Sequence, residues 1–86
     1  MLREADQLFK ENKYEEAAIN FELLVKSGGY GENPLVLFNL GRCFSEMGKH
    51  EQAIEQFEKA GQRLLTLGDD ADEELVQRTF YMLGNS

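Results

Sequence analysis

The sequence contains almost none of the residue patterns from which catalytic and metal sites are built. Its 86 residues include one cysteine and one histidine, which can form neither an internal disulfide nor a Cys/His metal site. There is no glycine-rich phosphate loop, no pair of catalytic carboxylates and no Ser-His-Asp order. We therefore predict that the protein is not an enzyme and that it holds no cofactor and no metal ion.

Basic residues and signals for membranes or secretion are scarce as well. Nine Lys and Arg stand against 16 Asp and Glu, and the net charge is −7. Nucleic-acid binding requires a concentrated Lys/Arg surface, and no apolar run approaches the roughly 18 residues of a membrane-spanning helix. The first residues, MLREADQLFKEN, have no apolar signal-peptide core. We expect no nucleic-acid partner, no membrane insertion and a cytoplasmic location.

Turn-forming residues are too few for a β-sheet protein. Proline occurs once and tryptophan never, and most of the eight glycines fall between periodic segments, where glycine can end a helix. Leu, Ala, Glu, Gln and Lys, which favour helices, are plentiful. The composition therefore predicts one all-α domain.

Two stretches of the chain align with each other without a gap. Residues 5–21 read ADQLFKENKYEEAAINF and residues 41–57 read GRCFSEMGKHEQAIEQF, a spacing of 36 residues. Apolar and small residues recur in both at helical intervals. Each stretch is interrupted by a residue that readily adopts the left-handed conformation, Asn12 in the first and Gly48 in the second. Each unit is therefore predicted to be two amphipathic helices folded back on each other.

The periodic segments predict five helices, at residues 2–11, 14–27, 34–47, 50–67 and 71–83. The glycines expected to end the second helix are Gly28, Gly29 and Gly31. We expect Gly68 to end the fourth helix in the same way. Asn33 should cap the third helix, with Pro34 as its first residue. Asp69 and Asp70 are expected to cap the fifth.

The second unit carries a specific series of apolar, small and aromatic residues: Leu37, Leu40, Gly41, Phe44, Gly48, Ala53, Phe57 and Ala60. By this series it resembles the tetratricopeptide repeat family. The first unit follows the pattern less closely, with Ala5, Asn12 and Leu24 at three of these positions. The resemblance implies an α-solenoid of antiparallel helix pairs over residues 1–86. Repeat 1 would span about 1–31, repeat 2 about 34–67, and a capping or partial third-repeat helix about 71–86.

The tail EELVQRTFYMLGNS resembles the opening of a third repeat. Leu83 and Gly84 correspond to Leu40 and Gly41, at a spacing of 43 residues instead of 36. The difference is about two helical turns. We therefore expect the fourth helix to be unusually long.

The family resemblance also implies a concave groove lined by the first helix of each unit. The positions that we expect to contact a partner there are Phe9, Phe38, Asn39, Arg42, Arg78 and Tyr81, with Glu46 and Met82 beside them. Aromatic residues and arginine are frequent interface anchors. The alternative is that Phe38 and Tyr81 pack against neighbouring helices, and that both arginines pair with surface carboxylates.

The clamp with which some members of the family bind the carboxylate tails of chaperones is incomplete in this sequence. The resemblance places Asn39 and Arg78 in two matching slots, but Asp6 and Met82 occupy two others. Asp6 would repel a carboxylate. We therefore expect a protein or peptide partner other than a chaperone tail.

Cys43 and His50 are the two reactive side chains that need a separate interpretation. Cys43 lies among apolar residues and is expected to be a small packing residue, because no base is placed to activate it. His50 takes the position of Tyr14 and is expected to pack across the helix pair.

The sequence thus predicts a protein-interaction scaffold that binds a peptide or a helix in its groove. Two alternatives remain open. One is self-association through exposed repeat ends, which would give a homo-oligomer. The other is a secretion chaperone built on the same repeat, which a co-purifying effector would reveal.

Overall fold

The computed structural model describes residues 2–27 and 33–85, which form five α-helices. They are α1 (Leu2–Lys10), α2 (Tyr14–Ser27), α3 (Pro34–Glu46), α4 (His50–Leu67) and α5 (Glu73–Asn85), with a 3₁₀ turn at Gly68–Asp70 before the last. The predicted all-α class is confirmed. The bounds of α2 and α4 are the predicted ones, and α4, at 18 residues, is the long helix that the spacing indicated.

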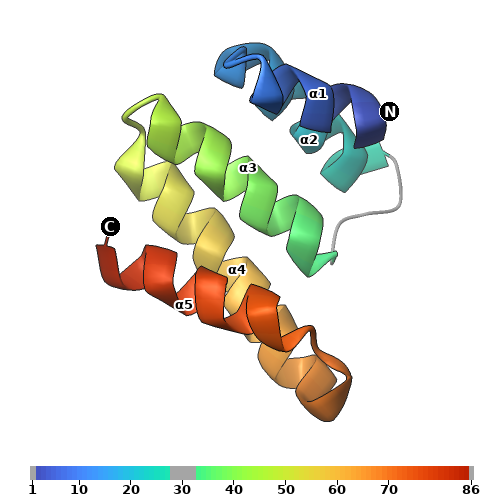
Figure 1. The fold of residues 1–86 in the computed structure, drawn as a ribbon, viewed down its shortest axis with the longest axis vertical. Coiled ribbons are helices and arrows are strands. Elements are labelled where there is room, and N and C mark those ends of the chain that lie inside the picture. The colour runs from blue at the N-terminus through green and yellow to red at the C-terminus, as the bar shows by residue number, and fades with distance from the viewer. Residues whose placement is uncertain (1, 28–32, 86) are drawn as a thin grey trace.

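Alternate helices lie on two sides of the molecule. Figure 1 shows α1, α3 and α5 towards the viewer and α2 and α4 behind them. Each helix packs mainly on its neighbours in the chain, α1 on α2, α2 on α3, α3 on α4 and α4 on α5. Short turns reverse the chain within the α1–α2 and α3–α4 pairs (Figure 1). This arrangement confirms the α-solenoid of antiparallel helix pairs.

The core contains the residues that recur along the sequence. Ala17 and Phe21 of α2 are fully buried, and so are Ala53 and Phe57 of α4, at the matching positions 36 residues later. Burying one such aromatic side chain contributes roughly 1.5–3 kcal/mol. The repeat in the sequence is therefore a repeat in the packing.

A glycine allows α3 and α4 to approach closely. A Cβ added at Gly41 would lie 2.7 Å from Cε1 of Phe57, closer than non-bonded carbon atoms come. The ring of Phe57 is fully buried and its centroid lies 5.5 Å from that of Phe38, so the ring has little room to move. Position 41 consequently accepts glycine and rejects larger residues.

The two tight turns share one geometry. Asn12 and Gly48 have φ angles of 64° and 77°, the left-handed conformation predicted for both. The N–H of the following residue donates to the C=O five residues earlier, at 2.9 Å in the first turn and 2.8 Å in the second. These bonds form the Schellman motif, which satisfies carbonyl groups left over at a helix end.

The predicted start of α3 and end of α4 are confirmed. Oδ1 of Asn33 accepts hydrogen bonds from the N–H groups of Leu35 (3.0 Å) and Val36 (3.3 Å), and Pro34 is the first helical residue. α4 ends at Gly68, which has a φ of 59°. The glycines expected to end α2 lie outside the described residues.

The predicted cap of α5 is wrong. Asp69 and Asp70 lie in the 3₁₀ turn, and Oδ1 of Asp72 instead accepts the hydrogen bond from the N–H of Leu75 at 3.3 Å. Because this turn adds residues to the connection, α5 begins at Glu73, two residues later than predicted.

The predicted packing of His50 is also wrong. His50 is exposed, whereas Tyr14 at the matching position packs edge-on against Phe9, with ring centroids 5.2 Å apart. The residue that matches Phe9 in the second unit is Ser45. His50 therefore has no ring to pack against.

Alanine at position 41 is expected to destabilise the fold by up to about 2 kcal/mol. Overpacking against Phe57 costs about 1–3 kcal/mol, which the better helix propensity of alanine, about 1 kcal/mol, offsets only in part. Gly61 is the control, because a Cβ there would lie 3.6 Å from the ring of Phe80, in ordinary contact. In urea unfolding followed by circular dichroism, Gly41→Ala should lower the midpoint and Gly61→Ala should raise it. Equal stabilisation by both substitutions would contradict the close approach at Gly41.

Replacement of Thr79 by valine is expected to stabilise the protein by about 1 kcal/mol. Within the described part of the chain, the Thr79 hydroxyl is buried without a hydrogen-bond partner, and leaving such a group unpaired costs about 1–3 kcal/mol. Val36 holds the matching position in α3 and is fully buried. Thr66→Val is the control, since that hydroxyl donates to the C=O of Gln62 at 3.0 Å on the surface. Thermal unfolding should show a higher melting temperature for Thr79→Val and no increase for Thr66→Val. An unchanged melting temperature for Thr79→Val would mean that the Thr79 hydroxyl does have a hydrogen-bond partner.

Candidate functional site

A hollow of about 540 Å³ lies between α3 and α5. Its lining residues are Phe38, Arg42 and Glu46 from α3 and Gln77, Arg78, Tyr81 and Met82 from α5. The helical period brings Phe38, Arg42 and Glu46 to one side of α3, because residues four apart lie one turn above one another. Two separate helices thus contribute one arginine each to the same depression.

Both arginines lie against aromatic rings. Cζ of Arg42 is 4.4 Å from the ring centroid of Phe9 on α1 and 5.9 Å from that of Phe38. Cζ of Arg78 is 5.3 Å from the centroid of Phe38. Such cation–π contacts contribute about 0.5–2 kcal/mol each. They also join the three helices α1, α3 and α5 across one face.

The ring contacts leave the N–H donors at the edges of both guanidinium groups in a position to bind a ligand. A ring contacts the flat face of a guanidinium group, while its N–H donors point outward in the plane. The three ion pairs within 4 Å among the described residues lie elsewhere and join lysines to nearby carboxylates, Lys10 to Asp6, Lys13 to Glu11 and Lys59 to Glu55. The hollow can therefore offer donors to a carboxylate beside an apolar floor.

The structure brings five of the six predicted contact residues together. Phe9, Phe38, Arg42, Arg78 and Tyr81 line the hollow or touch the arginines that line it. Asn39 is half-buried on α3 and does not line the hollow. Gln77 was missed, although it lies one helical turn before Tyr81 and could have been found by that spacing.

Phe38 and Tyr81 have different roles within the hollow. Phe38 is 2% exposed and packs against Phe57, so it belongs to the core, as the packing alternative predicted, and forms the floor. Tyr81 is 70% exposed and stands at the rim. Tyr81 and the two arginines are therefore the side chains of the hollow that a ligand could reach most directly.

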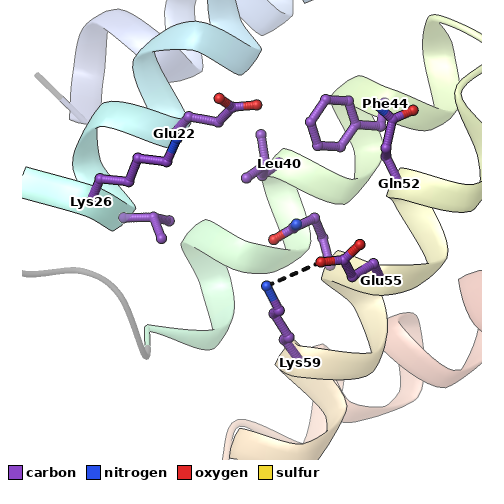
Figure 2. A pocket seen from close by; sticks show the side chains of 9 residues that line it. Glu22, Lys26, Leu40, Phe44, Gln52, Glu55 and Lys59 are labelled. Carbon is purple, nitrogen blue, oxygen red and sulfur yellow. Dashed lines mark ion pairs between the residues drawn. The ribbon is translucent and has the colours of Figure 1, made fainter.

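A second depression of about 300 Å³ lies where α2, α3 and α4 meet. Figure 2 shows Leu40 and Phe44 of α3 between Glu22 and Lys26 of α2 and the polar residues of α4. The ion pair between Lys59 and Glu55, at 3.4 Å, crosses its α4 side. Charges of both signs surround this depression, and none of the predicted contact residues line it. It is therefore a suitable control surface for substitutions at the hollow.

Cys43 is a packing residue, as the sequence predicted. Its side chain is fully buried, and burial raises the pKa of its thiol to about 12. A thiol held in the neutral form is a poor nucleophile. Cys43 lies on α3 between Arg42 and Phe44 and is not among the residues that line the hollow.

Native Cys43 is expected to resist alkylation at mildly alkaline pH. A pKa of about 12 leaves roughly a thousandfold fewer thiolates than an unperturbed cysteine has. Mass spectrometry should show slow modification by iodoacetamide in buffer and rapid modification of the same chain in urea. Equal rates in the two solvents would contradict the buried position of Cys43.

None of the helices within residues 2–27 and 33–85 is long and apolar enough to cross a membrane. A family model of the tetratricopeptide repeat matches residues 34–67, from the start of α3 to the end of α4. Comparisons with curated proteins and with solved structures gave no match. Repeats of this family are in general non-enzymatic scaffolds for contacts between proteins. Residues 34–67 are therefore similar to a tetratricopeptide repeat in their sequence and in the pairing of α3 with α4.

Proposed function

We propose that this chain is a protein-interaction scaffold and that the hollow between α3 and α5 binds a peptide segment of its partner. The observation that carries the proposal is the convergence of Arg42 and Arg78 on the rings of Phe9 and Phe38. Arginine and aromatic residues, clustered around a partly apolar depression, are the side chains that dominate binding energy at protein interfaces.

The chemistry of the hollow favours a peptide with one acidic side chain next to an apolar one. Two of the nine basic residues of a chain with net charge −7 meet here, and their N–H donors suit a carboxylate. Met82 and the exposed ring of Tyr81 offer an apolar surface beside them. Glu46 lines the same hollow and would repel a run of several acidic residues.

The test is to compare peptide binding by the native chain with binding by Arg42→Ala/Arg78→Ala. Linear peptides are first selected from a phage-displayed library with the native chain, and their affinities are measured by fluorescence anisotropy. A hydrogen bond to a charged group contributes about 1.5–3 kcal/mol, so the double variant should bind at least about tenfold more weakly. Affinity should also fall as salt rises, since the attraction is partly screened.

The matched control removes two positive charges at the second depression, with Lys26→Ala/Lys59→Ala. This variant should bind the selected peptides like the native chain, because neither lysine lines the hollow between α3 and α5. Phe38→Ala is unsuitable, since removing a buried aromatic costs about 3–5 kcal/mol of stability. Selected peptides without acidic residues, or equal losses in both double variants, would overturn the proposal.

A further inference from the structure

The outer side of α5 carries a series of apolar residues that the described helices cover only in part, since two of them, Val76 and Leu83, are half-buried against the core. Val76, Phe80, Leu83 and Gly84 follow one another at intervals of four, three and one residues, which places them on one side of the helix. Phe80 is 43% exposed. Nothing described lies within 4 Å of the position that a Cβ at Gly84 would take.

The α3–α4 pair shows what packs on such a surface. Leu37, Leu40 and Gly41 of α3 match Phe80, Leu83 and Gly84 of α5 at a spacing of 43 residues. In α3 this side is buried, and the ring of Phe57 lies directly against Gly41. The matching surface on α5 therefore has the shape that receives an aromatic ring over its glycine.

We infer that a second copy of this chain covers the outer side of α5, with Phe80 of each copy packed over Gly84 of the other. A symmetric dimer pairs residue i with j and j with i. Phe80 and Gly84 lie one turn apart, about 6 Å along the axis, so two antiparallel α5 helices bring each ring over a glycine simultaneously. The surface thus supplies both the ring and the space for it.

The distribution of charge permits this contact in an acidic protein. Residues 59–68 and 75–86 contain none of the 16 acidic residues, so this surface lacks the carboxylates that would repel a copy of net charge −7. Phe80 also packs against Gly61 of α4, and Leu65, one turn further along α4, is 69% exposed. The apolar surface without acidic residues therefore extends from α5 onto the end of α4.

The contact with a second copy is tested by sedimentation equilibrium over a wide range of concentration. The native chain should show a reversible monomer–dimer equilibrium. Gly84→Leu should weaken the dimer about tenfold or more, because its side chain fills the space for the ring. It should leave the monomer folded, because position 84 is open. Phe80→Asp should have the same effect by placing a carboxylate on the surface.

Tyr81→Asp is the matched control, since it adds the same charge to α5 at the rim of the hollow and should leave the dimer intact. Higher salt should strengthen the dimer by screening the repulsion between acidic copies, whereas it should weaken peptide binding at the hollow. A chain that stays monomeric at every concentration would overturn the inference, and so would a dimer unaffected by Gly84→Leu. Neither result would bear on the hollow, because the two surfaces share no residue.

Discussion

The contact between the ring of Phe57 and the backbone at Gly41 is the constraint on which the site depends. It determines how closely α3 and α4 approach, because any side chain at position 41 would collide with the ring. Phe57 in turn supports Phe38, 5.5 Å away, and Phe38 carries the guanidinium groups of Arg42 and Arg78. A short series of contacts therefore leads from the α3–α4 packing in the core to the arginines at the hollow between α3 and α5.

The arginines show how an acidic chain can present positive charge locally. Rings orient the guanidinium groups of Arg42 and Arg78 without neutralising them, whereas a carboxylate in the same place would compete with a ligand. In the first unit the residue matching Arg42 is Asp6, which pairs with Lys10 at 3.5 Å. The two repeat units thus share a backbone geometry, while residues at matching surface positions differ in charge.

The features predicted from the sequence are those determined by neighbouring residues. Asn12 and Gly48 are recognisable as turn residues because few types adopt a positive φ. The start of α5 was not predictable, since three aspartates precede it and the sequence does not show that two of them lie in a 3₁₀ turn, which leaves Asp72 as the cap. The predicted packing of His50 was wrong because the second unit has Ser45 where the first has Phe9, the ring on which Tyr14 packs. The hollow itself depends on how the long α4 directs α5 across α3, which helical periodicity does not specify.

The division of the hollow into a buried floor and an exposed rim has a consequence for how such a module evolves. Phe38 belongs to the core and also forms the floor of the proposed binding hollow, so a change there would affect both and selection will tend to retain it. Tyr81 is 70% exposed, and substitutions at exposed positions usually change stability by less than about 0.5 kcal/mol. Related chains could therefore acquire new partners through the rim while keeping the same floor.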